Sequence, residues 1–337
     1  MSRFLYILFF LISIDSLNAK EVQKLVWPSP PDEAKIEYLS FVRSPEEFGI
    51  EKGFFSRAFD FLFDVSEASI SAPFGLHSDK GRLYITDISS KSLYIFDKKE
   101  DETITIEGSD DESFLYPIDV VTDVDGNIFV SDSVRAKIYV FEKDGDFSYS
   151  ISNKVIQRPI GIAISNDNKK LYVVDSVASK IHVITPKGKF IKSIGKKGLN
   201  DGEFNRPTFI DIGKDGKIYV TDSMNHRVQI LNPDGKFINK FGYIGQEIGS
   251  FGSPRGISLD SYENIYVSDT MYNTIQVFNN SGELLLVFGN YGKNKGEFAL
   301  AEDISITDDN TIYISDTNNR RVQVFKLLDS TAVRSVK

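Results

Sequence analysis

The sequence contains no cysteine, which excludes disulfide bonds, thiolate metal sites, haem attachment through a CxxCH motif and a cysteine nucleophile. It has only three histidines, and its net charge of −9 gives no excess of Lys and Arg for binding nucleic-acid phosphates. Of its 337 residues, 41% are hydrophobic and 26% charged, as in globular proteins with a sizeable core. We therefore predict a globular protein without a nucleic-acid partner and without a cofactor.

Residues 1–19 have the features of a signal peptide. Arg3 supplies a positive start, residues 4–14 form an apolar run, and Ala19 is a small residue suited to cleavage. The alternatives are a membrane anchor and a buried strand, but the run is shorter than the roughly 20 residues that span a bilayer. We expect cleavage after Ala19 and a soluble periplasmic or extracellular protein, with no stable membrane insertion after cleavage.

Three short segments flank the main body of the chain. Residues 20–35 form a proline-rich lead-in, and residues 36–42 read as a single strand without a neighbouring hairpin partner. Residues 53–64 place their apolar side chains on one stripe, which predicts a short helix that docks on the body of the protein. Residues 330–337 form a C-terminal tail.

Four apolar runs separated by turn residues make up a repeating unit, seen most clearly in residues 207–242. Each run alternates in the strand period, and Asp215-Gly216 and the NPDG segment 232–235 supply turn residues between them. The unit is therefore predicted to be a four-stranded antiparallel meander, with strands a to d in chain order.

The unit recurs six times from about residue 70. An aspartate closes strand b of each copy, at intervals of about 45 residues, which is the period of propeller blades. We predict an all-β, six-bladed β-propeller over residues 36–329. The aspartates are Asp87, Asp132, Asp175, Asp222, Asp269 and Asp316.

These motifs resemble the NHL-repeat family of six-bladed β-propellers. The resemblance rests on GxxxGEFxxPxxI at residues 198–210, followed by YVTDSMNHRVQIL, and on YISDTNNRRVQVF at residues 313–325. It covers roughly residues 73–325. With its N-terminal features, the chain is similar to bacterial exported NHL-repeat proteins. The resemblance implies a binding module, since relatives serve as protein- or RNA-binding modules.

The sixth repeat lacks its own outer strand. Strand c ends at Phe325, and the residues after it contain no further strand pattern, which would leave an unpaired edge. We predict that residues 36–42 pair with residues 322–325 and close the ring.

A basic residue follows the strand-b aspartate by five positions in four repeats. Recurrence in blade after blade argues against catalysis, because chemistry needs one site and not six. We predict exposed ion pairs that hold the hairpin, each contributing ~0–1 kcal/mol. The pairs are Asp132 with Lys137, Asp175 with Lys180, Asp222 with Arg227 and Asp316 with Arg321.

At the channel mouth two carboxylates could hold a cation or a cationic ligand group, but we favour the alternative that they are solvated, hydrogen-bonded carboxylates. Asp119 and Asp303 replace small residues near the start of strand a in blades 2 and 6, which flank blade 1 with His77. Related peptide α-amidating lyases hold zinc through three histidines. Here His77, His182 and His226 lie in strand a, strand c and a b–c turn, so we predict no zinc site and no other metal site.

Propeller ligands usually meet the face that carries the b–c and d–a loops. These loops offer aromatic, Met, Asn and Arg side chains, which suit a protein or peptide contact. We therefore expect a non-enzymatic exported binding or scaffold module without catalytic residues; the alternative is a metal-dependent lyase or lactonase with its site at the channel mouth. The candidate ligand-binding residues are Tyr116, Arg135, Arg206, Met224, Asn225, His226, Met271, Tyr272, Asn273, Asn318, Asn319 and Arg320.

Overall fold

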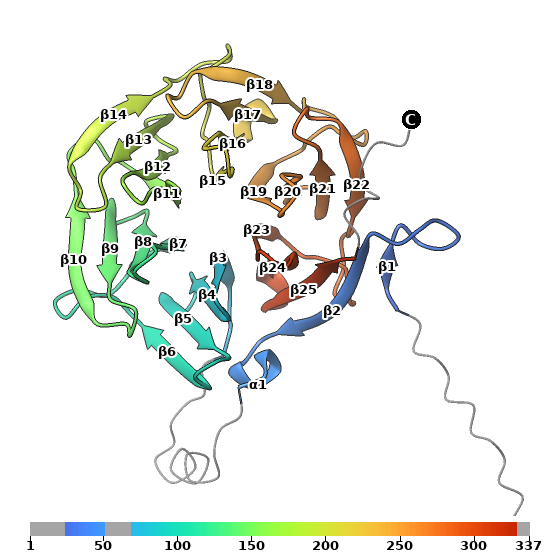
Figure 1. Cartoon of the computed structure of the whole chain (residues 1–337), viewed down its shortest axis with the longest axis horizontal. Coiled ribbons are helices and arrows are strands. Elements are labelled where there is room, and N and C mark those ends of the chain that lie inside the picture. The colour runs from blue at the N-terminus through green and yellow to red at the C-terminus, as the bar shows by residue number, and fades with distance from the viewer. Residues whose placement is uncertain (1–23, 51–68, 329–337) are drawn as a thin grey trace, which may run out of the picture.

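The computed structural model describes residues 24–50 and 69–328, which form a ring of six antiparallel sheets (Figure 1). Each sheet is one blade, with strand a innermost and strand d at the rim. This arrangement confirms the predicted six-bladed propeller and the period read from the turn aspartates.

The first three blades follow one another along the chain. Blade 1 contains β3 (Pro73–Asp79), β4 (Arg82–Asp87), β5 (Ser92–Asp97) and β6 (Glu102–Ile106). Blade 2 contains β7 (Pro117–Thr122), β8 (Ile128–Asp132), β9 (Lys137–Phe141) and β10 (Phe147–Ser152). Blade 3 contains β11 (Pro159–Ile164), β12 (Leu171–Asp175), β13 (Lys180–Ile184) and β14 (Phe190–Ile194).

The remaining blades continue in the same order, and two of them carry a short 3-10 helix after strand b. Blade 4 contains β15 (Ile210–Ile212), β16 (Ile218–Asp222), η1 (Ser223–Asn225), β17 (Arg227–Leu231) and β18 (Phe237–Phe241). Blade 5 contains β19 (Pro254–Leu259), β20 (Ile265–Asp269), β21 (Thr274–Phe278) and β22 (Leu284–Phe288). Blade 6 contains β23 (Ala301–Ile306), β24 (Thr311–Asp316), η2 (Thr317–Asn319) and β25 (Arg321–Leu327).

The N-terminal strand β2 (Ile36–Val42) completes blade 6. It pairs antiparallel with β25, with Tyr38 opposite Phe325 and Val42 opposite Val322. Figure 1 shows β2 beside β25 at the rim of the ring. The predicted closure is confirmed, and it supplies the outer strand that the sixth repeat lacks.

The lead-in and the segment after β2 add two features that the sequence analysis did not predict. Strand β1 (Val26–Trp27) pairs with β2 and extends blade 6 to five strands. Helix α1 (Pro45–Phe48) starts on a proline and ends at Gly49, which adopts φ +97°. The helix predicted at 53–64 lies outside the described residues. Within the described ranges, no helix is long and apolar enough to cross a membrane.

The turns between strands form at residues whose side chains and backbone favour tight turns. At the c–d turn of blade 4, the Asn232 side chain accepts hydrogen bonds from the N–H groups of Asp234 and Lys236, and Gly235 adopts φ +82°. Only a residue without Cβ takes that conformation at little cost. The turn therefore forms where the sequence predicts it.

The core lies between blades. Side chains from both faces of each blade pack against the neighbouring blades. In blades 2, 4, 5 and 6, a phenylalanine from the preceding d–a loop also packs into this core. These phenylalanines are fully buried and hold the loops against the ring: Phe114, Phe204, Phe251 and Phe298.

Candidate functional site

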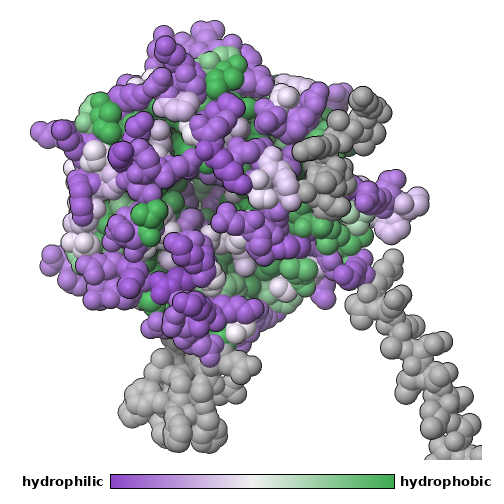
Figure 2. Space-filling model, viewed as in Figure 1, coloured by the Kyte–Doolittle hydropathy of each residue, from purple (hydrophilic) through white to green (hydrophobic). Residues whose placement is uncertain are grey.

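The ring has two chemically different faces. We call the face formed by the b–c turns and d–a loops the contact face. The a–b and c–d turns form the opposite face, where the channel opens. Figure 2 shows one face of the ring, on which mainly hydrophilic side chains surround a central hollow.

The strand-b aspartates anchor the contact face. In blade 2, one carboxylate oxygen of Asp132 accepts the N–H groups of Val134 and Arg135 at 3.1 and 3.0 Å, and the other accepts Leu115 N–H at 2.7 Å. All six aspartates are fully buried, and each accepts a hydrogen bond from its preceding d–a loop. Every b–c turn is therefore fixed against the neighbouring loop.

The predicted exposed ion pairs are corrected by the structure. Arg227 contacts Asp222 at 2.8 Å and Arg321 contacts Asp316 at 2.7 Å, but these four side chains are at most 8% exposed. Removal of one partner would leave an uncompensated buried charge, so these pairs matter more than surface pairs do. In blade 2, Lys137 pairs with Glu112 of the d–a loop rather than with Asp132.

Of the twelve residues predicted for the ligand-binding face, five have side chains that join neighbouring loops instead of pointing freely into solvent. Their side chains hydrogen-bond to the backbone of neighbouring loops, which stiffens the contact face but reduces what they can offer a ligand. The five are Arg135 (to Ser113), Asn225 (to Gly198), Tyr272 (to Gly245), Asn273 (to Leu300) and Asn319 (to Gly292).

Besides Met224 and Met271, five predicted residues remain, and they differ in exposure. Tyr116 is half-buried and packs edge-on against Phe74, with 6.4 Å between ring centroids. His226 is half-buried and adopts φ +52°, and its Nδ1 atom is buried without a hydrogen-bond partner. The exposed members are Arg206, Asn318 and Arg320.

An apolar arc on the contact face was not recognised in the sequence. The residue two positions after the strand-b aspartate is exposed and apolar in four successive blades, whereas blades 1 and 6 carry Ser89 and Asn318 there. The fixed spacing from the strand-b aspartates marks this position in the sequence, and the sequence analysis names Met224, Met271 and Asn318 among its members. The apolar arc consists of Val134 (59% exposed), Val177 (48%), Met224 (54%) and Met271 (62%).

The channel contains a cavity of about 950 Å³. Its lining runs from the inner strands to the a–b turns, including Gly81, Asn166 and Asp308, so the cavity opens on the face opposite the contact face. At its inner end lies Phe209, which is buried and stacks on Phe74 with 6.3 Å between ring centroids.

Asp119 and Asp303 line this cavity and bridge neighbouring blades. Asp119 of blade 2 accepts Ile162 N–H of blade 3, and Asp303 of blade 6 accepts Leu76 N–H of blade 1, both at 2.8 Å. The sequence analysis places both residues at the channel mouth, but in the structure they lie at the level of Phe209, away from the a–b turns at which the cavity opens, and each carboxylate accepts backbone N–H groups.

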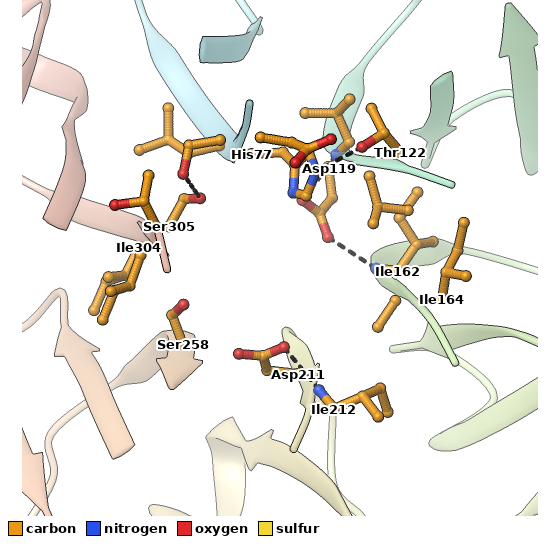
Figure 3. Close-up of a pocket in the computed structure, with 18 of the residues that line it drawn as sticks. His77, Asp119, Thr122, Ile162, Ile164, Asp211, Ile212, Ser258, Ile304 and Ser305 are labelled. Carbon is orange, nitrogen blue, oxygen red and sulfur yellow. Dashed lines mark hydrogen bonds between the residues drawn. The ribbon is translucent and has the colours of Figure 1, made fainter. Parts of the chain in front are cut away.

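A third carboxylate, Asp211 of blade 4, belongs to the same set and was missed. It accepts Leu259 N–H of blade 5 at 2.9 Å, and Figure 3 shows it on the cavity wall across from His77. Phe209 occupies the position equivalent to Asp119, and Asp211 follows two residues later. Because strand residues two apart point to the same side, this spacing could have revealed it.

Glycines fill the alternate positions of the inner ring. Gly75, Gly161 and Gly256 of the odd blades each lie against the backbone of the next blade, where an added Cβ would approach within 2.1–2.7 Å. Blades 2, 4 and 6 therefore bind the next blade through a hydrogen bond to an aspartate side chain. Blades 1, 3 and 5 pack their backbone directly against that of the next blade.

The three histidines do not converge. His77 lines the cavity, with Nε2 at 2.9 Å from Thr122 Oγ1, and burial lowers its pKa to about 4. His182 is buried in β13 beside Ser193, and His226 lies on the contact face. In the described part of the chain, no three His, Asp or Glu side chains are grouped so that they could hold a metal ion.

The channel carboxylates should make stability fall as pH rises. Burial raises the pKa of Asp119 and of Asp211 to about 7, despite backbone N–H groups that favour the ionised form. Burial, and then repulsion by Asp119, raises the pKa of Asp303. Since the unfolded pKa is about 3.9, the folded chain binds extra protons between about pH 4 and 7, so this contribution is complete below pH 4 and lost above pH 7.

We therefore expect Asp119→Asn to reduce the loss of stability between pH 5 and pH 8 by on the order of 2 kcal/mol. The measurement is urea unfolding of both proteins at the two pH values. Because the substitution also changes a hydrogen bond equally at each pH, only the difference between the two pH values counts. The same pH dependence in both proteins would contradict the assignment.

The geometry defines a six-bladed β-propeller of four-stranded antiparallel blades, with a loop face and a channel cavity. A family model described as 6-bladed beta-propeller matches residues 102–154, 156–217 and 257–334, and the NHL repeat model matches residues 204–231. Since the first covers more than half of the chain, the protein belongs to this six-bladed β-propeller family and carries an NHL repeat. The resemblance to NHL-repeat propellers is thereby confirmed. No curated protein sequence matches the chain.

Solved structures share the fold at low sequence identity. A catalytically inactive virginiamycin B lyase from Staphylococcus aureus with quinupristin is 18% identical, with a TM-score of 0.57, covering 77% of this chain and 96% of that one. An auxiliary nutrient binding protein from Bacteroides thetaiotaomicron is 14% identical, with a TM-score of 0.60 and coverages of 76% and 69%. A chain of a nidogen/laminin complex is 18% identical, with a TM-score of 0.57 and coverages of 71% and 86%. At these identities the likeness concerns the fold alone.

Proposed function

We propose that this protein is a non-enzymatic binding propeller, exported to the periplasm or the cell exterior, that holds a protein or peptide partner against its contact face. The observation that carries the proposal is the apolar arc over blades 2 to 5. When a partner covers exposed apolar side chains and removes them from water, the free energy of the complex is lowered.

The distribution of exposed apolar side chains favours this face over the other. Of the large hydrophobic side chains exposed in the described residues, ten lie in b–c turns or d–a loops and only two, Val124 and Tyr262, lie in the turns of the opposite face. The d–a loops add Tyr243, Ile244 and Ile248 between blades 4 and 5. Met and Tyr are enriched at the centres of protein interfaces, where a few apolar anchors supply most of the affinity.

The contact face is also rigid enough to act as a binding platform. Its turns are tied to the d–a loops by the buried aspartates, and Tyr272 OH donates to Gly245 O at 2.7 Å. A pre-ordered surface loses little conformational entropy on binding. Similar propellers include one in a complex of two proteins and one titled a nutrient binding protein, which supports a binding role.

Substitution of the apolar arc tests this function. We expect the triple variant Val177→Ser, Met224→Ser, Met271→Ser to weaken capture of the partner from an exported protein fraction at least tenfold. Loss of only 1.4 kcal/mol from the three contacts together suffices for that change. Capture is measured with immobilised protein at a series of concentrations, with quantitative mass spectrometry of the bound proteins.

The matched control is the double variant Val124→Ser, Tyr262→Ser on the opposite face. Its capture should equal that of the wild type, and all variants should melt alike, because exposed substitutions usually change stability by no more than about 0.5 kcal/mol. Equal loss of capture in both variants, or unchanged capture by the triple variant, would refute the proposed function.

A further inference from the structure

The cavity wall is chemically divided at one level of the channel. Strand a of each blade contributes one residue there, and the polar members come from four successive blades, 4, 5, 6 and 1. Blades 2 and 3 contribute the apolar members, so at this level four blades form a polar side and two form an apolar side. Figure 3 labels the polar members around the cavity. In blade order the residues are His77, Val121, Ala163, Asp211, Ser258 and Ser305.

Asp211 carries the carboxylate on the polar side of this level. Its two oxygens accept the N–H groups of Ile212 and Leu259 at 2.7 and 2.9 Å. A carboxylate has about four acceptor positions, so acceptor capacity remains on the side that faces the cavity. Two other polar residues of this level are already engaged, since Ser305 bonds to Ser78 and His77 bonds to Thr122.

The mouth of the cavity is acidic. The a–b turns place Asp79, Asp123, Asp308 and Asp309 around it, and the Lys80 side chain lies 3.2 Å from Asp79. A cleft lined by one sign of charge concentrates ions of the opposite sign. Cations are therefore drawn toward the channel, and anions are repelled from it.

We propose that the channel cavity binds a small organic cation, a primary amine with a short hydrocarbon chain, whose ammonium group is held by Asp211. The hydrocarbon lies against Val121 and Ala163. An ammonium group has three N–H donors, which match the free acceptor positions of Asp211 and the hydroxyl oxygen of Ser258. This site lies on the face opposite the contact face, so it goes beyond the proposed partner binding and does not depend on it.

The division of the wall discriminates among ligand classes. An anion would meet the acidic mouth and Asp211, and Lys80, the cation at the mouth, is already paired with Asp79. A fully polar ligand would have no apolar group to pack against Val121 and Ala163. Small-molecule pockets usually pair apolar walls with a few orienting polar groups. An amphipathic amine can hydrogen-bond to the polar side and pack its hydrocarbon against the apolar side.

Hexylamine, 1-hexanol and hexanoate form a matched set of probes, because they share the hydrocarbon and differ in charge. We expect hexylamine to bind the full chain with a Kd of about 1 mM or tighter, and at least tenfold more tightly than either other probe. Calorimetric titration at pH 8 keeps the Asp211 carboxyl ionised, since its pKa is about 7. Equal binding of 1-hexanol, or tighter binding of hexanoate, would overturn the proposal.

Two variants locate the site. Asp211→Asn should weaken hexylamine binding at least tenfold, whereas Asp309→Asn at the mouth should change it less than threefold, since Asp309 is exposed and already paired with Lys326 at 2.8 Å. Should Asp211→Asn fail to fold, a wild-type crystal soaked in hexylamine decides the matter. Nitrogen within hydrogen-bond distance of Asp211 supports the proposal, and its absence from the cavity refutes it.

Discussion

Replacing Ile36 by aspartate is expected to open the ring and to lower the stability by about 4 kcal/mol or more. Ile36 is fully buried in β2, in the cluster that contains Phe325 and Leu327 of blade 6. Loss of a buried isoleucine alone costs about 2–5 kcal/mol, and the new charge has no partner in that cluster. The change is measured by urea and thermal unfolding.

The same strand supplies the control. Leu39 is 48% exposed at the irregularity between Tyr38 and Ser40, so Leu39→Asp should change the stability by less than about 1 kcal/mol. Equal melting of Ile36→Asp and wild type would mean that β2 does not hold blade 6 together.

Gly75→Ala is expected to lower the free energy of unfolding by about 3 kcal/mol. The added Cβ would lie 2.1 Å from Ile118 O and 2.7 Å from Asp119 Cα, both in the backbone of blade 2. No rotation of a side chain relieves such a contact, so the inner strands of blades 1 and 2 would have to separate. Urea unfolding measures the loss.

Gly249→Ala distinguishes this effect from the general cost of replacing glycine. Gly249 adopts φ +88°, but no heavy atom lies within 4 Å of the position of an added Cβ. Only the backbone strain applies, about 1 kcal/mol. Similar losses for the two variants would show that close approach of the inner strands is not what Gly75 provides.

The architecture could be predicted because the information for a blade is local. Alternating apolar residues, turn residues such as those at 232–235 and the recurring strand-b aspartate all lie within one repeat of about 45 residues. Closure by residues 36–42 followed from a missing strand, since the sixth repeat ends at Phe325 without its outer strand. Local pattern and edge pairing were sufficient for these features.

Contacts between blades were less accessible to sequence reasoning. Asp211 lies two residues beyond the position of Asp119, and its role depends on which N–H group of the next blade faces it. Lys137 has the spacing of an ion pair with Asp132, but the d–a loop of blade 2 brings Glu112 closer. Such choices are made by the packing of loops around the ring, which the repeat period does not contain.

The most direct test of the ring is a disulfide between β2 and β25, the strands whose pairing closes it. Glu37 lies opposite Lys326, and paired Cα atoms of antiparallel strands are about 4.5–5.5 Å apart, within the range that a disulfide spans. Because the chain has no cysteine of its own, the double variant Glu37→Cys, Lys326→Cys can form only this bond within one molecule. The closed ring predicts rapid intramolecular oxidation of this pair. The control, Glu37→Cys combined with Lys240→Cys in blade 4, should form no intramolecular disulfide. Failure of the first pair to form a disulfide, or equal disulfide formation in both variants, would contradict the closed ring.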